Sequence, residues 1–273
     1  MYPICLQIDD KIRFRGESVK LQILKKGRKE DMKIKEKINM DFEALIENGA
    51  INIVAFGDSI THGAFGAGEI DYEAVYHALL RKKINALRNY VPVNVINSGI
   101  GGDCAQNAIA RMDRDIFAHH PDLVIVCFGL NDVNGTLEDY VSSLETIFRA
   151  CKEHAVDTIF MTPNMLNTYV SDGTEEKYRE YAKVTAEYQN SGRMDTYMQK
   201  AKEISEECGI AVCCYSVWKK MQKDGVDTTA LLANSINHPT RKMHELFADE
   251  LFKMMLDDAF ESGATESTMY RKE

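Results

Sequence analysis

Ser59 is the residue of this sequence best placed to act as a nucleophile. An apolar run at residues 51–56 has the length and composition of a buried strand, and it ends abruptly at the turn Gly57-Asp58-Ser59. In an α/β protein, ligands bind beyond the carboxyl ends of the strands, so a serine at this turn would face a substrate. A serine hydroxyl is a weak nucleophile, so this chemistry also requires a base within hydrogen-bond reach.

His238 is the predicted base. It lies in a polar segment at residues 234–240, just before the last predicted helix, and the pKa of a histidine lies near neutrality, where a general base is most effective. His62 is the closest rival in sequence, but on the turn that carries Ser59 it would be poorly oriented toward the serine hydroxyl. The other histidines fall on predicted helices or at helix ends, where a plain surface or core role is expected: His77, His119, His120, His154 and His244.

Three hydrogen-bond donors could stabilise the negative oxygen of a tetrahedral intermediate. The first is the backbone N–H of Ser59 itself. The second would come from the loop at residues 97–103, whose glycines allow the backbone to approach a ligand closely, although glycines also simply make turns. The third is the side-chain amide of Asn131, just past the third predicted strand, where an asparagine could equally serve a turn or a helix cap.

From residue 50 onward, short apolar runs alternate with stretches of helical periodicity. Apolar runs of four to six residues between helices are typical of a parallel sheet buried on both faces, so the sequence predicts an α/β protein, a three-layer α/β/α sandwich. The predicted strands are residues 51–56, 93–96, 122–127, 158–161 and 210–215. The predicted helices are residues 72–88, 105–117, 137–154, 195–207 and 245–260.

Residues 1–50 differ from the rest of the chain. They are predicted to form an N-terminal extension and not an independent domain, while residues 51–273 form the main domain. Residues 40–47 could form one or two helical turns packed on the core. Three partly alternating stretches could be short strands: residues 4–8, 11–15 and 19–24.

An insertion at residues 164–193 interrupts the alternation of strands and helices. Part of it, about residues 175–188, has helical spacing, and it contains four tyrosines, Tyr169, Tyr178, Tyr181 and Tyr188. Segments inserted at the carboxyl edge of such a sheet often wall an active site. A surface helix with its tyrosines packed down is an equal alternative.

The residues singled out above occur in the order and context of a known family. The chain resembles the SGNH, or GDSL, hydrolases over roughly residues 51–260. Each matching motif stands at a predicted strand end or, for the histidine, just before the last helix. The motifs are Gly57-Asp58-Ser59, Gly102, Gly129-x-Asn131-Asp132 and His238-Pro239.

This resemblance implies a flavodoxin-like sheet of five parallel strands and a specific set of site residues. It implies Ser59 as the nucleophile and His238 as the base. The oxyanion hole would be formed by the backbone N–H groups of Ser59 and Gly102 and by the side chain of Asn131. Members of the family are esterases, lipases, thioesterases and carbohydrate deacetylases, and their mechanism requires no metal and no other cofactor.

The chain departs from the family pattern at Ser235, because the family usually has an aspartate three residues before the histidine. A carboxylate on the far ring nitrogen fixes the tautomer and stabilises the imidazolium. Three alternatives follow: a backbone carbonyl orients His238, an acid such as Asp227 or Asp224 folds in, or the protein is a weak or inactive relative. A Ser–His dyad with a carbonyl partner is favoured. The segment resembles that of bacterial family members with a long tyrosine-bearing insertion.

The sequence therefore predicts a carboxylic ester hydrolase that forms an acyl-enzyme on Ser59. The acyl group is expected to be small, of acetyl type, because no extended apolar lid segment is apparent. The substrate would be a small-molecule or carbohydrate acyl ester. The alternative is a non-catalytic or weakly active ligand-binding relative on the same fold, and Ser235 is its best support.

Composition and charge argue against several other classes. The formal net charge of −9 is opposite to that of a typical nucleic-acid binder, so no nucleic-acid partner is expected. No Gly-Lys-Ser/Thr motif follows the first predicted strand, which disfavours a nucleotide-binding protein. Seven cysteines without a Cys-x-x-Cys pair are expected to be reduced and buried rather than bound to zinc.

No apolar run approaches the roughly 20 residues that a membrane span requires. The first residues also lack the basic and apolar regions of a secretory signal. A cytoplasmic protein without a membrane span is therefore predicted, and the sequence leaves open a homo-oligomer.

Overall fold

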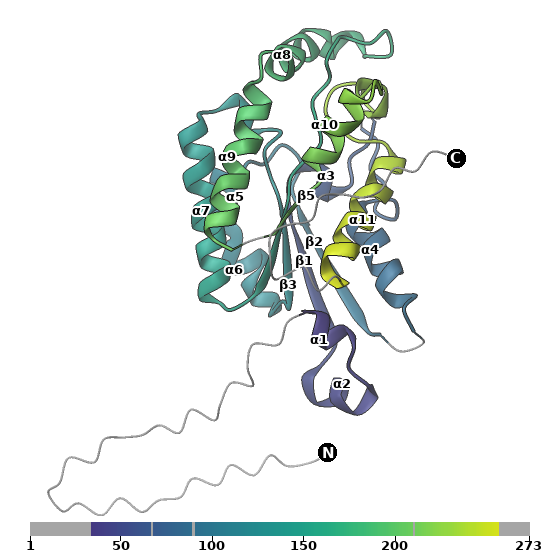
Figure 1. The fold of residues 1–273 in the computed structure, drawn as a ribbon, viewed down its shortest axis with the longest axis vertical. Coiled ribbons are helices and arrows are strands. Elements are labelled where there is room, and N and C mark those ends of the chain that lie inside the picture. The colour runs from purple at the N-terminus through teal and green to yellow at the C-terminus, as the bar shows by residue number, and fades with distance from the viewer. Residues whose placement is uncertain (1–33, 67, 89–90, 210, 257–273) are drawn as a thin grey trace, which may run out of the picture. The chain divides into compact units, whose positions relative to one another are not determined.

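The computed structural model describes residues 34–66, 68–88, 91–209 and 211–256, and its centre is a five-stranded parallel sheet (Figure 1). The strand order is β2-β1-β3-β4-β5. This order is that of the flavodoxin-like doubly wound fold, so the predicted fold class is confirmed. The strands are β1 Ile51–Gly57, β2 Val93–Gly99, β3 Leu123–Cys127, β4 Asp157–Met161 and β5 Ala211–Cys213.

Helices cover both faces of this sheet. They are α1 Ile34–Ile38, α2 Phe42–Asn48, α3 Ser59–His62, α4 Tyr76–Asn85, α5 Ala105–Ala108, α6 Met112–Asp115, α7 Leu137–Glu153, α8 Arg179–Asn190, α9 Arg193–Glu207, α10 Tyr215–Lys223 and α11 Arg241–Leu256. Short 3₁₀ turns lie at Ile109–Arg111, Phe117–His119, Asp132–Asn134, Glu176–Tyr178 and Thr229–Leu231. Figure 1 shows α5, α6, α7 and α9 on one face and α4, α10 and α11 on the other.

Three neighbouring strands, β2, β1 and β3, end at the same level. In the register of the sheet, Gly57 at the end of β1 lies opposite Gly99 of β2 and Cys127 of β3. Because all of these strands are parallel, the segments that follow them leave the sheet side by side at its carboxyl edge. The strand register thus places residues 58–66, 100–104 and 128–134 next to one another.

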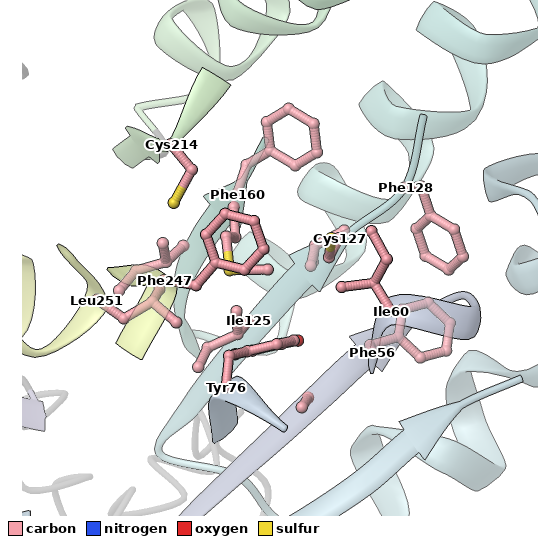
Figure 2. Close-up of a cluster of buried hydrophobic side chains, with 14 of the residues drawn as sticks. Phe56, Ile60, Tyr76, Ile125, Cys127, Phe128, Phe160, Cys214, Phe247 and Leu251 are labelled. Atoms are coloured by element: carbon pink, nitrogen blue, oxygen red, sulfur yellow. The ribbon is translucent and has the colours of Figure 1, made fainter. Parts of the chain in front are cut away.

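The core is centred on β1 and β3, which are almost fully buried. Figure 2 shows the cluster, in which Phe56 from β1 meets Phe128 edge to face, with ring centroids 5.4 Å apart. Phe247 and Leu251 join the cluster from α11 and are fully buried (Figure 2). Each such side chain contributes about 1.5–3 kcal/mol when it is buried. The core therefore fixes α11, and the segment in front of it, against the sheet.

Residues 105–117 are helical over most of the predicted span, but they do not form one continuous α-helix. The segment is divided into α5, a 3₁₀ turn and α6, and the division falls around Arg111. The buried guanidinium of Arg111 donates to the carbonyl oxygens of Ser98 (2.7 Å) and Gly57 (3.1 Å), and it pairs with Asp103 at 2.8 Å. These contacts with the strand ends bend the chain, and helical periodicity alone does not reveal them.

Other predicted elements are found with shifted ends. Helix α4 begins at Tyr76 instead of residue 72, because Asp71 Oδ1 accepts from the backbone N–H groups of Glu73 and Ala74 and holds a turn there. Helix α11 begins at Arg241, four residues before the predicted start, and residues 257–260 of that prediction lie outside the described residues.

Helix α1 is tied to the amino edge of the sheet, opposite the edge that carries Ser59. The backbone N–H of Ile34 donates to Asp157 (2.7 Å), and Lys37 pairs with Asp122 (2.8 Å). Helix α2 matches the helical turns expected at residues 40–47. The strands predicted at residues 4–8, 11–15 and 19–24 lie outside the described residues, so the N-terminal extension stays a prediction. Among the described helices, none is long and apolar enough to cross a membrane.

Replacement of Arg111 by methionine should destabilise the fold strongly. The variant would leave Asp103 buried without its cation, and breaking a buried ion pair in this way costs about 3–5 kcal/mol. We expect a loss of that size in the free energy of unfolding, measured by urea denaturation. The matched control is Arg114→Ala, since Arg114 is 74% exposed and pairs with Asp115, and its effect should stay within about 0.5 kcal/mol. Equal effects of the two changes would contradict the structural role of Arg111.

Candidate active site

Ser59 begins the short helix α3 directly after β1. Asp58 caps this helix, because its Oδ1 accepts from the backbone N–H of Ile60 at 2.9 Å. Gly57 has no room for a side chain, since a Cβ there would lie 2.2 Å from Oγ1 of Thr61. The order Gly-Asp-Ser therefore has a packing reason at each position: close approach, helix capping, and then a hydroxyl at the edge of the sheet.

Ser59 and His238 are 179 residues apart in the sequence, and the fold brings their side chains into contact. Nε2 of His238 lies 3.0 Å from Oγ of Ser59, and Nδ1 lies 3.1 Å from the carbonyl oxygen of Phe65. A carbonyl oxygen can only accept a hydrogen bond, so Nδ1 of the neutral ring carries the proton. Nε2 is then left to accept from the serine hydroxyl, which is the arrangement that a general base requires.

No carboxylate in the described part of the chain hydrogen-bonds to His238. Ser235 stands at the position where the family usually has an aspartate, and its backbone is left-handed, with φ of 58°. Asp227 accepts from the hydroxyl of Tyr169 at 2.7 Å, and Asp224 pairs with Lys220 at 2.6 Å. Both acids considered from the sequence are thus engaged elsewhere, and the main-chain carbonyl is the group that faces Nδ1.

The loop that carries His238 is held by asparagine side chains. Oδ1 of Asn234 accepts from the backbone N–H groups of Ile236, Asn237 and His238, at 2.9–3.0 Å. The fully buried Asn164 donates to the carbonyl oxygen of Asn237 at 2.8 Å. These bonds satisfy a polar loop that the fold buries, so the position of the imidazole is fixed by its own backbone as well as by Phe65.

Burial of His238 lowers the pKa of its imidazole, and the Phe65 carbonyl opposes this effect by stabilising the protonated ring. Desolvation disfavours the charged form of a histidine, whereas an acceptor on Nδ1 favours it. The net direction is downward, so the ring is neutral at pH 7 and available to accept a proton.

The three expected oxyanion donors come from segments that meet at the sheet edge. The side-chain amide of Asn131 donates to the carbonyl oxygen of Asp103 at 2.8 Å, which ties the third strand's turn to the glycine loop. Gly102, the residue before Asp103, has φ of 81°, a left-handed conformation that suits glycine. The backbone N–H of Ile100 donates to the carbonyl oxygen of Gly57 at 3.0 Å, next to Ser59. An amide has two N–H donors, so Asn131 keeps one for a ligand.

Two buried carboxylates, Asp58 and Asp132, lie behind this site. Each uses one oxygen for a backbone N–H, from Ile60 and Ala105 respectively, while the other oxygen has no hydrogen-bond partner among the described residues. Burial is the main reason that the pKa of Asp58 rises to about 7 and that of Asp132 to about 6, and the charge of Asp103 adds to both shifts. The two carboxylates therefore cap the starts of α3 and α5. Their raised pKa values mean that each is protonated more readily than an exposed aspartate.

His62, the rival base, faces another part of the surface. Its Nε2 lies 3.2 Å from the hydroxyl of Tyr72, and with that residue and Arg81 it lines a separate cavity of about 440 Å³. Two further histidines are buried and neutral: burial lowers the pKa of His77 to about 4 and that of His244 to about 3. The structure thus brings only His238, among the described histidines, into contact with the hydroxyl of Ser59.

The insertion touches both the histidine loop and the oxyanion turn. The backbone N–H of Asn167 donates to the carbonyl oxygen of Ile236 at 2.9 Å. Tyr181, in α8, lies near the side chain of Asn134, which donates to the carbonyl oxygen of Asn131 at 3.0 Å. The insertion thus lies beside the histidine loop. Of its tyrosines, Tyr188 packs against the core, as the second alternative expects, whereas Tyr181 stays 38% exposed.

Sequence reasoning missed the contributions of Phe65, Asn164 and Asn234. The Phe65 contact uses a main-chain carbonyl, which every residue has, so residue type gave no signal. Asn234 could have been found, because an asparagine four residues before His238 is typical of a side chain that accepts from following backbone N–H groups. Asn164 is distant in sequence, and only the fold brings it to the histidine loop.

The chain matches the model of the GDSL-like Lipase/Acylhydrolase family over residues 55–246. It is 29% identical to an acetylxylan esterase of Geobacillus stearothermophilus over 168 residues, which cover 53% of this chain and 75% of the relative. It is 26% identical to an arylesterase of Vibrio mimicus over 149 residues, which cover 54% of this chain and 71% of the relative. The chain belongs to the GDSL-like lipase/acylhydrolase family and is a carboxylic ester hydrolase.

Solved structures share the fold. A lipase/acylhydrolase from Enterococcus faecalis superposes with a TM-score of 0.58 at 23% identity, covering 75% of this chain and 95% of that one. An acetylxylan esterase from Geobacillus stearothermophilus gives a TM-score of 0.57 at 23% identity, with 75% and 94% covered.

Replacement of Asp58 by asparagine should change how stability depends on pH. Because the folded-state pKa of Asp58 is raised from 3.8 to about 7, the folded protein holds more protons than the unfolded chain between these values, and its stability falls as pH rises. Asparagine keeps the capping oxygen but does not titrate. We therefore expect the free energy of unfolding of Asp58→Asn, relative to the natural protein, to rise across this window by at most about 1.4 kcal/mol per pH unit.

Urea denaturation at a series of pH values measures this difference. Above the window, both proteins should show a constant offset. A difference that does not vary with pH would contradict the protonation of Asp58 in the folded protein.

Proposed function

We propose that this protein is a serine esterase in which Ser59 is the nucleophile and His238 is the base. The observation that carries the proposal is the pair of contacts made by the imidazole, to Oγ of Ser59 on one side and to the carbonyl oxygen of Phe65 on the other. A hydroxyl nucleophile needs a proton acceptor in the correct tautomer, and these two contacts supply it.

In the first half of the reaction, Oγ of Ser59 attacks the carbonyl carbon of the ester while its proton passes to Nε2 of His238. A C–O bond forms, and the carbonyl electron pair moves onto oxygen to give a tetrahedral intermediate. When the intermediate collapses, the bond to the alcohol breaks and the departing oxygen takes the proton from Nε2. The acyl group is then bound to Ser59.

The negative oxygen of the intermediate would be bound by the backbone N–H groups of Ser59 and Gly102 and by the remaining N–H of Asn131. Donors that are already in place need no reorganisation when the charge develops. Support comes from Asn131, whose amide is held by the carbonyl oxygen of Asp103.

In the second half of the reaction, His238 takes a proton from a water molecule that attacks the acyl carbon. The same oxyanion donors bind the second tetrahedral intermediate. Its collapse breaks the bond to Oγ of Ser59, which regains a proton from Nε2, and releases the acid.

A short acyl group, of acetyl type, on a carbohydrate or a small alcohol is the substrate class we propose. Two relatives at 26–29% identity are named as an acetylxylan esterase and an arylesterase, and both names denote enzymes that hydrolyse esters. The insertion carries three partly exposed tyrosines, Tyr169, Tyr178 and Tyr181, whose flat faces could contact a sugar ring or an aryl group.

Replacement of Ser59 by alanine should abolish ester hydrolysis, because no other hydroxyl can take its place opposite Nε2 of His238. With p-nitrophenyl acetate we expect kcat to fall at least about 1,000-fold, and His238→Ala should cause a loss of similar size. The matched control is Ser142→Ala, an exposed serine on α7, which should keep full activity. Unchanged hydrolysis by Ser59→Ala would overturn the proposal.

A fluorophosphonate probe gives a second measurement that does not depend on the choice of substrate. It should label Ser59 in the natural protein and leave Ser59→Ala unlabelled. Failure to label the natural protein would favour the alternative, a non-catalytic ligand-binding relative.

Replacement of Asn131 by alanine should lower kcat about 100- to 1,000-fold with a smaller effect on KM, because its amide acts on charge that is present only in the transition state. The control is Asn94→Ala, an asparagine in β2 whose amide donates to Asn52. A rise in KM with unchanged kcat would instead make Asn131 a substrate-binding residue.

A further inference from the structure

The partner of His238 is a main-chain atom, so its position depends on how one turn is held. This turn, defined by residues 63–66 and 68–71, follows α3 and supplies the carbonyl oxygen of Phe65. An aspartate side chain could adjust its own torsions to follow the imidazole. A main-chain carbonyl moves only with its backbone, so any movement of the turn changes the hydrogen bond between the Phe65 carbonyl and Nδ1 of His238.

The turn is short and is closed by main-chain bonds, including an antiparallel bridge between Ala64 and Ile70. The backbone N–H of Phe65 donates to the carbonyl oxygen of Glu69 (3.0 Å), and that of Asp71 donates to Gly63 (2.9 Å). A further bond, from Ala64 to the carbonyl oxygen of Ser59 at 2.9 Å, connects it to the nucleophile. The side chain of Phe65 is fully buried against His244, whereas Glu69 and Asp71, at the other end of the turn, are partly exposed to solvent.

Arg241, the first residue of α11, contacts this turn through its side chain. Its guanidinium pairs with Glu69 at 2.6 Å and with Asp71 at 2.9 Å, and its central carbon lies 4.7 Å from the centre of the Phe65 ring. Arg241 therefore contacts the turn at Glu69, at Asp71 and at Phe65, the residue whose carbonyl faces His238. One planar guanidinium with several donors can make all of these contacts at once, which an ammonium group cannot.

Arg241 also lies three residues after His238 in the chain. The segment that presents the base thus presents the group that fixes the base's partner. Helix α11 extends from Arg241 into the core through the fully buried Phe247 and Leu251, so the guanidinium is attached to a rigid element.

We infer that Arg241 is a positioning residue for His238, and that it acts by holding the turn of residues 63–66 and 68–71 so that the Phe65 carbonyl takes the place of the missing carboxylate. This inference rests on the proposed function, because it concerns the base of the same reaction. It adds a residue that the family motifs do not include and explains how the chain works with Ser235 at the acid position.

Removal of Arg241 should lower the reaction rate without a comparable loss of folding stability. The side chains of Arg241 and Glu69 are about half exposed, at 50% and 49%, and exposed ion pairs contribute little to stability. Arg241 lowers the pKa values of Glu69 and Asp71, so both carboxylates stay charged over the neutral range. Removal of Arg241 should leave the protein folded while the turn loosens.

The experiment compares Arg241→Ala with the natural protein in p-nitrophenyl acetate hydrolysis. We expect kcat to fall about 10- to 100-fold with little change in KM, as for a small misplacement of a catalytic group, and the melting temperature to change little. Arg241→Lys keeps the charge but cannot span both carboxylates, so its kcat should lie between the two. The control Arg149→Ala removes an exposed arginine that pairs with Glu145 on α7, and its kcat should be unchanged.

The pH profile of kcat/KM distinguishes positioning from a simple effect of charge. The Phe65 carbonyl raises the pKa of His238, so its loss should move the acid limb to lower pH. If Arg241 acted only as a nearby cation, its removal would favour the imidazolium and move the limb to higher pH. The other titratable neighbours, Asp71 in the turn and His244 on α11, are present in both proteins.

The carboxylate partners provide an independent test. The double variant Glu69→Gln/Asp71→Asn should lose kcat to a similar extent, and adding Arg241→Ala to it should cause little further loss, because the three side chains act as a unit. Full additivity of the losses would overturn the inference.

The remaining outcomes are also decisive. Unchanged kcat in Arg241→Ala, a rise in KM alone, or an acid limb that moves to higher pH overturns the positioning role while Ser59-dependent activity remains. Ester hydrolysis that persists in Ser59→Ala, assayed in parallel, overturns the proposed function itself. The two failures are therefore distinguishable.

Discussion

The hydrogen bond from Nδ1 of His238 to the carbonyl oxygen of Phe65 is the contact on which the rest of the site depends. It determines which ring nitrogen carries the proton, and so leaves Nε2 free to accept from Ser59. A neutral acceptor can fix the tautomer as well as a carboxylate can, but it has no charge to attract the ring. Geometry must therefore supply what electrostatic attraction does not, and the asparagines around the histidine loop and the arginine beside the turn are the parts of the structure suited to that task.

The sheet provides the frame for this geometry. Gly57, Gly99 and Cys127 end three parallel strands at one level, so Ser59 and the candidate oxyanion donors leave the sheet as neighbours. The helix that follows His238 is anchored in the same core by Phe247. The site thus joins segments that are far apart in sequence, and each of them is fixed by packing that begins within a few residues of the reacting atoms. This proximity of core and site is the reason that a close-packed glycine, Gly57, precedes Asp58 and Ser59.

The sequence was sufficient to predict the fold class, the five-stranded sheet and the approach of His238 to Ser59, because strand-end motifs and apolar runs are local in the chain. It did not predict the break in the helix at residues 105–117, since Arg111 is drawn to carbonyl oxygens on two distant strands. It also could not identify Phe65, because the atom that matters belongs to the backbone. Asp227 and Asp224 were plausible acids by position alone, and only their contacts with Tyr169 and Lys220 remove them.

The low basicity that burial gives to His238 has a consequence for the alcohol half of the substrate. A less basic imidazole takes a proton from serine less readily, but its protonated form is a stronger acid toward the departing oxygen. Sugar alkoxides are poor leaving groups and gain most from such protonation, whereas nitrophenolate leaves without help. In the proposed reaction, protonation by the buried ring therefore contributes more to the cleavage of alkyl esters than to that of nitrophenyl esters.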